Sequence, residues 1–332
     1  TNPSELPPVA NSQAMETARQ AALQSVVLLK NDHGVLPLSA ENLSSIAVIG
    51  PLADAPYQQL GTWVFDGDIE LSITPLQSIR SLVGNEIDVR YVRAMETSRS
   101  KVSAAFDEAA AIASNADMAL LFLGEESILS GEAHSRADIN LPGDQAELVG
   151  RIRETGKPVV AVILAGRPLT LTNIVDQVDG ILYAWHPGTM GGPAIADLLF
   201  GVESPSGKLP ATFPRMVGQI PIYYSQKNSG KPPSRDNVAY IDDIDSRAEQ
   251  TSLGMAAFHL DTCFTNDQFI RCCTRNCWRP FGSVDWKRRN RFLQNGHLNG
   301  VIRGSFKGLQ VTYERFFILG SILKLNIVQQ IF

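Results

Sequence analysis

Residues 159–166 read Val-Val-Ala-Val-Ile-Leu-Ala-Gly, and this apolar run is one of four that decide the fold class. Comparable runs stand at residues 46–50, 118–124 and 180–185. Short apolar runs rich in Val and Ile, mostly closed by Gly, are typical of strands buried on both faces. We therefore expect four core strands at these positions.

Amphipathic segments with helical spacing lie between the runs, at roughly residues 102–114, 143–155 and 190–200. Alternating strands and helices predict an α/β fold, a mostly parallel sheet with helices on both faces. Residues 12–29 precede the first run and are also predicted to be a helix. Ala and Leu are frequent there, apolar residues recur at helical spacing, and Gly34 follows.

Ligand-contacting groups in such a sheet lie on loops beyond the carboxyl ends of the strands. Four loops qualify, at residues 51–63, 125–141, 167–172 and 186–192. The second is the longest and the most polar, which is unusual for a connection within a compact unit.

The long loop carries three glutamates, among them Glu125 and Glu132, together with His134 and Arg136. A glutamate beside an apolar strand end can have a raised pKa and act as a general acid. The residues alone equally allow a solvated acidic loop that ends in a helix cap at Asp144.

Composition indicates an ordinary globular protein, with 44% hydrophobic and 19% charged residues. No apolar run reaches the roughly 18 residues of a membrane span, and the first residues do not read as a signal peptide. The two parts of the chain differ in net charge. Residues 1–246 hold 17 Lys and Arg and 29 Asp and Glu, whereas residues 247–332 hold 12 Lys and Arg and 5 Asp and Glu.

A series of motifs follows in order along residues 10–245. It comprises Ala18-Arg-Gln-Ala-Ala-Leu-Gln-Ser-Val-Val-Leu-Leu-Lys-Asn31, Gly61-Thr-Trp63, Gly131-Glu-Ala-His-Ser-Arg136, Leu141-Pro142, Gly166-Arg-Pro168, Ala194-Ile-Ala-Asp-Leu-Leu-Phe-Gly201 and Pro205-Ser-Gly-Lys-Leu-Pro210. In this order and spacing the series resembles the C-terminal α/β sandwich of family 3 glycoside hydrolases, in particular bacterial β-glucosidases. The resemblance implies that residues 1–246 form this sandwich domain.

The resemblance also implies roles for individual residues. Glu132 falls on the position of the family's general acid/base, and Glu125 is a less favoured rival. Trp63 resembles the tryptophan that stacks on the sugar beyond the cleaved bond, although a tryptophan buried in an interface would look the same. Arg136 and His134 are further substrate-binding candidates, and Arg136 could equally anchor the loop.

Family enzymes carry their nucleophile, an Asp, on a preceding (β/α)8 barrel, and no barrel-length stretch precedes Ala18. We therefore expect the nucleophile to be missing from these 332 residues and this chain alone to be inactive. The expected partners are that barrel and a β-linked oligosaccharide or glucoside. No metal or other cofactor is expected, nor a nucleic acid or membrane partner, and the implied location is periplasmic or secreted.

Residues 247–332 depart from the family pattern, and we expect a poorly ordered tail produced by a reading-frame shift. The tail holds all four cysteines, Cys263, Cys272, Cys273 and Cys277, and the basic run 287–291. A zinc site or a nucleic-acid contact is the alternative interpretation, but the cysteine spacing fits no regular paired pattern.

Two other functions compete with the enzyme fragment. A non-catalytic carbohydrate-binding module would use Trp63 and the long loop without chemistry. A nucleotide-binding domain is disfavoured because residues 50–54, Gly-Pro-Leu-Ala-Asp, match neither G-x-G-x-x-G nor a Walker loop. The segment Trp185-His186, at a strand-to-helix turn, is predicted to serve packing.

Overall fold

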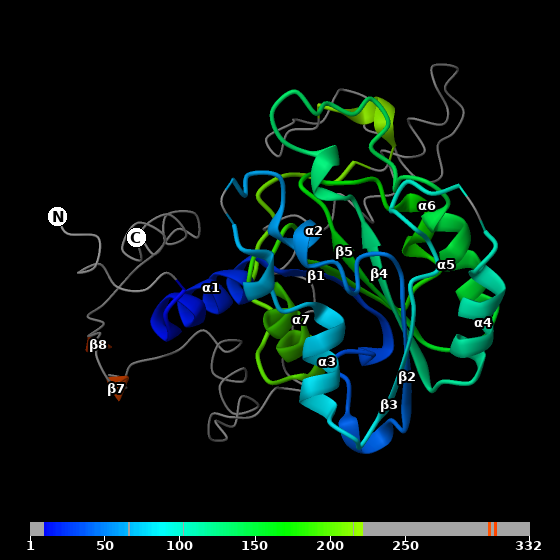
Figure 1. Ribbon diagram of the computed structural model, residues 1–332, viewed down its shortest axis with the longest axis horizontal. Helices are drawn as coiled ribbons and strands as arrows, with labels where there is room; N and C mark the ends of the chain where they lie inside the picture. The colour runs from blue at the N-terminus through cyan, green and yellow to red at the C-terminus, as the bar shows by residue number, and fades with distance from the viewer. Residues whose placement is uncertain are drawn as a thin grey trace, which may run out of the picture. The chain divides into compact units, whose positions relative to one another are not determined.

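The computed structural model describes residues 10–65, 67–101, 103–214 and 216–221, and the backbone of 305–306 and 309–310 (Figure 1). The chain divides into two units, Thr1–Trp278 and Arg279–Phe332. In the second unit, β7 (Ser305–Phe306) and β8 (Leu309–Gln310) form an antiparallel pair. The four cysteines, the basic run 287–291 and the predicted boundary at residue 246 lie outside the described residues.

The first unit holds a six-stranded sheet with the strand order β1-β6-β5-β4-β2-β3. Its strands are β1 (Val27–Asn31), β2 (Ser45–Ile49), β3 (Asp88–Val92), β4 (Met118–Gly124), β5 (Val159–Leu164) and β6 (Gly180–Tyr183). All pairs are parallel except β1, which lies antiparallel to β6 at one edge. The predicted mostly parallel α/β sheet is confirmed.

Helices cover both faces of this sheet, as predicted. They are α1 (Ser12–Ser25), α2 (Pro56–Leu60), α3 (Pro75–Val83), α4 (Phe106–Ser114), α5 (Gln145–Arg153), α6 (Thr172–Val175) and α7 (Gly191–Phe200), with short 3-10 turns at Asp32–Gly34, Ala40–Asn42, Ile69–Leu71, Ser127–Leu129 and Val217–Gln219. Figure 1 shows α1, α3 and α7 on one side of the sheet and α4, α5 and α6 on the other.

Each face has its own apolar core because neighbouring strand residues point in opposite directions. Leu121 and Leu123 of β4 pack with α4, α5 and α6, whereas Leu120 and Phe122 pack with α1, α3 and α7. All four side chains are fully buried. Truncating such a side chain to Ala costs about 2–5 kcal/mol, so these contacts stabilise the strands from which the loops extend.

The helix predicted over residues 12–29 is confirmed up to Ser25 and is wrong only over its last four residues. Helix α1 ends at Ser25, Val26 is extended with φ −67° and ψ 130°, and residues from Val27 onward form β1. Consecutive β-branched residues weaken a helix, and here they complete the edge of the sheet beside β6. Strand β3 and helix α3 were not predicted either.

Candidate functional site

Four loops meet at the carboxyl edge of the sheet, following β2, β4, β5 and β6. The Gln58 side chain in the first loop accepts hydrogen bonds from the backbone N–H (2.8 Å) and the hydroxyl (2.9 Å) of Ser127 in the second. Gly188 in the fourth loop donates its N–H to the Gln59 carbonyl over 2.9 Å. These bonds make one surface from segments far apart in sequence.

Glu125 follows β4 directly, and its side chain is 0% exposed. It forms ion pairs with Arg136 and with Arg167, whose Nε lies 3.2 Å from Oε1 of the carboxylate. A general acid must reach the oxygen that it protonates. The buried and doubly paired carboxylate of Glu125 does not meet this requirement.

Glu132 lies at the exposed tip of the same loop. Its carboxylate forms no ion pair or hydrogen bond with the residues that the structure describes. The backbone on both sides has positive φ, +104° at Gly131 and +63° at Ala133. The loop therefore turns sharply at Glu132 and leaves its side chain accessible.

Trp63 lies on the neighbouring loop and is 60% exposed. Phe65, at 84% exposed, lies beside it with the ring centroids 6.2 Å apart. A Cβ on Gly131 would clash with the methyl group of Thr62, so the two loops touch at the residues adjoining Trp63 and Glu132. The structure thus brings together the two loops that carry the predicted acid and the predicted stacking residue.

His134 and Arg136, the other predicted substrate-binding residues, make their bonds within the loop. Nδ1 of His134 lies 3.1 Å from the carbonyl oxygen of Ser130. Arg136 pairs with Glu125 and donates from Nη2 to the Asn140 carbonyl over 3.1 Å. These contacts are those of loop anchors.

His186, predicted to serve packing at the end of β6, lies beneath the contact between the loops. Nε2 of His186 lies 3.1 Å from the Ser130 hydroxyl. A Cβ added to Gly61 would lie 3.0 Å from the Cβ of His186. Burial disfavours the imidazolium and lowers the pKa of His186 to about 4, and the charge on Arg167 acts in the same direction. His186 is therefore a neutral structural residue at pH 7.

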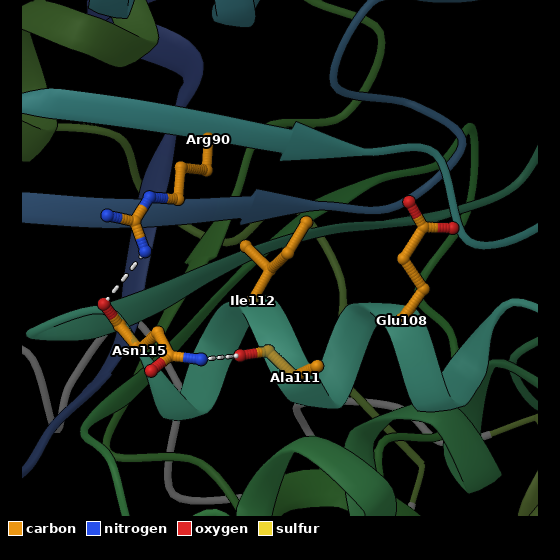
Figure 2. Close-up of a pocket in the computed structure, with 5 residues that line it drawn as sticks. All are labelled: Arg90, Glu108, Ala111, Ile112 and Asn115. Atoms are coloured by element: carbon orange, nitrogen blue, oxygen red, sulfur yellow. Dashed lines mark hydrogen bonds between the residues drawn. The ribbon is translucent and has the colours of Figure 1, made fainter.

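Two hollows are lined by neither Glu132 nor Trp63. One, of about 420 Å³, lies where β2 and β3 end and is lined by residues including Asp54, Tyr91, Arg93 and Glu96. Burial raises the pKa of Tyr91. The other, of about 410 Å³, is lined by Arg90, Glu108, Ala111, Ile112 and Asn115 along α4 (Figure 2), where Arg90 donates to the Asn115 carbonyl over 3.0 Å. Its residues belong to none of the four loops.

Among the described residues, no cluster of three or more His, Cys, Asp or Glu side chains could hold a metal ion. In the same part of the chain, every helix is too short or too polar to cross a lipid bilayer.

Comparison with known proteins gives one consistent family. Residues 26–260 match the model of the glycosyl hydrolase family 3 C-terminal domain. The chain is 40% identical over 250 residues to a periplasmic β-glucosidase of Salmonella typhimurium, covering 68% of this chain and 32% of the relative. It is 36% identical over 216 residues to a β-xylosidase of Formosa agariphila, covering 64% and 30%.

Among solved structures, the β-glucosidase of Listeria innocua in complex with glucose superposes with a TM-score of 0.63 at 34% identity. The match covers 70% of this chain and 32% of that one. The chain therefore spans about a third of the length of the relatives that it matches.

Proposed function

Because this chain belongs to glycosyl hydrolase family 3 and its residues 26–260 match the family's C-terminal domain, we propose that it supplies the general acid/base carboxylate of a retaining β-glycosidase. The residue is Glu132, and the substrates are compounds with terminal β-linked glucosyl residues. The relatives named above are β-glucosidases and a β-xylosidase. Their names support a β-glycoside as the substrate class.

The accessibility of Glu132 is the observation that supports this proposal. Its carboxylate is exposed at the tip of a loop that touches the loop of Trp63, whereas Glu125 is buried under two arginines. An exposed indole face suits the apolar C–H face of a pyranose, so Trp63 would hold the leaving-group sugar beside Glu132.

Retaining hydrolysis needs a second carboxylate about 5–5.5 Å from the first, acting as nucleophile. In the first step the nucleophile bonds to the anomeric carbon while Glu132 gives its proton to the departing glycosidic oxygen. In the second step Glu132 takes a proton from water, whose oxygen attacks the anomeric carbon and releases the nucleophile. The nucleophile would be supplied by a barrel domain like the one expected from the family resemblance.

Without the barrel, the chain would offer neither a nucleophile nor the contacts that bind the sugar. The general acid by itself would raise the rate of hydrolysis by only about 10²–10⁴-fold. We expect no useful glycosidase activity from it. The mechanism requires no metal or organic cofactor. The name of the Salmonella relative supports a periplasmic or secreted location.

A carbohydrate-binding module without catalysis is the second candidate, and the exposed Trp63–Phe65 pair favours it. It predicts sugar binding by this chain but no chemistry from Glu132.

Mixing the chain with a separately made family 3 barrel distinguishes the two candidates. We expect cleavage of an aryl β-glucoside only in the mixture, reduced about 10²–10⁴-fold by Glu132→Gln. The control is Glu108→Gln, which removes an exposed carboxylate on α4 and should leave the rate unchanged. Sugar binding without cleavage in any mixture would favour the binding module.

A further inference from the structure

The buried carboxylate of Glu125 has no part in the proposed chemistry, yet it joins two arginines at the base of the loop that carries Glu132. We propose that Glu125 is a positioning residue, which through Arg136 and Arg167 holds that loop so that Glu132 reaches the glycosidic oxygen. This inference rests on the proposed function of Glu132.

Glu125 is fixed to the rigid part of the fold. It follows the last residue of β4, and its backbone N–H donates to the Leu164 carbonyl of β5 over 2.7 Å. The side chain is 0% exposed and pairs with Arg136 and Arg167. Glu125 is therefore the loop residue that is bonded directly to the sheet.

Arg167 holds the loop on both sides of Glu132. Its Nε donates to Glu125, and its Nη2 donates to the carbonyls of Leu129 and His134, the latter over 3.1 Å. These two carbonyls lie three residues before and two residues after Glu132. The guanidinium offers several donors in a fixed plane, which a lysine cannot reproduce.

Arg136 holds the part of the loop that returns to the sheet. It pairs with Glu125 and donates to the Asn140 carbonyl. The loop is thus bonded at Leu129, His134 and Arg136, while the Glu132 carboxylate has no partner among the described residues. The backbone is held and the side chain is left available for proton transfer.

Charge explains why Glu125 is essential to this arrangement. Replacing its carboxylate by an amide leaves two guanidinium groups in the same partly buried space without a counter-ion. Breaking a buried ion pair on one side is strongly destabilising because the remaining charge is uncompensated. The arginines would turn toward solvent and release the loop carbonyls.

The test compares Glu125→Gln with Glu126→Gln, each in the full chain mixed with a family 3 barrel. Glu126 is the neighbouring residue and is also buried and ion-paired. However, its partners are Arg99 (3.0 Å) and Ser98 (2.8 Å), which lie outside the Glu132 loop. It is therefore a matched control for general destabilisation.

We expect kcat/KM for phenyl β-glucoside, whose leaving group needs a proton, to fall at least about tenfold in Glu125→Gln. For 2,4-dinitrophenyl β-glucoside, whose leaving group needs none, kcat/KM should stay within about twofold. Glu126→Gln should change the two substrates equally. Equal losses for both substrates in Glu125→Gln, or no loss, would overturn the inference.

Hydrogen exchange on the chain alone gives a readout that does not depend on activity. The amides of Ser130 and His134 form hydrogen bonds within the loop, and they should exchange at least about tenfold faster in Glu125→Gln than in wild type or Glu126→Gln. Unchanged exchange would overturn the inference even if the mixtures are active. If exchange is faster in Glu125→Gln but the wild-type mixtures are inactive, Glu125 would still be shown to hold the loop, and the proposed function would be wrong.

Arg167→Lys is the second variant if Glu125→Gln does not fold. It keeps the charge but cannot bond to both loop carbonyls. As in Glu125→Gln, kcat/KM should fall for phenyl β-glucoside but not for 2,4-dinitrophenyl β-glucoside, and the amides of Ser130 and His134 should exchange faster. Wild-type behaviour of Arg167→Lys in both measurements would overturn the inference.

Discussion

Acidification should destabilise the domain through His186, and the size of the effect follows from its surroundings. Burial lowers the pKa of this imidazole from 6.5 to about 4. In the unfolded chain the same side chain takes up a proton below about pH 6.5. Between these two values only the unfolded state binds the proton, so the free energy of unfolding falls as the pH is lowered.

The magnitude comes from the gap between the two pKa values. At about 1.36 kcal/mol for each pKa unit, neutral burial of His186 contributes up to about 3 kcal/mol. The contribution is fully present above about pH 6.5, is lost progressively down to about pH 4, and changes no further below that.

Urea unfolding of the full chain at pH 7, 6, 5 and 4 measures this effect, with His186→Gln as the comparison. The amide of Gln can bond to the Ser130 hydroxyl but does not titrate. Carboxylates titrate equally in both proteins, so the difference between the two pH profiles isolates the histidine. Parallel profiles over this range would contradict the prediction, because they would mean that His186 is not buried in its neutral form.

Two further changes test the packing of the loops. Gly124→Ala should cost at least about 2 kcal/mol in urea unfolding, since φ is +132° there and a Cβ would clash with the Leu164 carbonyl. Gly156→Ala is its control, with positive φ but no atom within 4 Å of the Cβ, and an equal cost at both sites would contradict the steric explanation. Trp63→Ala should weaken binding of an aryl β-glucoside to the chain–barrel mixture about fivefold, measured by inhibition. It should leave the unfolding free energy within about 0.5 kcal/mol because the side chain is 60% exposed, and a large loss of stability would mean that Trp63 is a packing residue.

The central sheet could be predicted because strands such as β4 and β5 are apolar on both faces, and short runs of this kind are typical of parallel sheets covered by helices. Edge strands do not share this pattern. Strand β3 includes Asp88 and Arg90 and is partly exposed. The β1 residues continue the apolar pattern of α1, and pairing with β6 in the folded chain, rather than local spacing, makes them a strand.

The position of the long loop after β4 could be predicted from the sequence, but the contacts that its residues make could not. The motif Gly131-Glu-Ala-His-Ser-Arg136 pointed to Glu132, and the structure leaves that side chain exposed. The pairing of Glu125 with Arg167 joins residues 42 positions apart. A position for His186 under Ser130 likewise depends on two loops meeting at the sheet edge, which no local pattern specifies.

The acid/base role of Glu132 is tested most directly with azide and Glu132→Ala in the chain–barrel mixture, with 2,4-dinitrophenyl β-glucoside as substrate. Removing the acid/base leaves the first step intact and slows the second, and the vacated space admits azide, which needs no base. We expect azide to raise the rate at least about tenfold and the product to be β-glucosyl azide, with no effect of azide on wild type. An unchanged rate, or α-glucosyl azide as the product, would contradict the assignment of Glu132 as the acid/base.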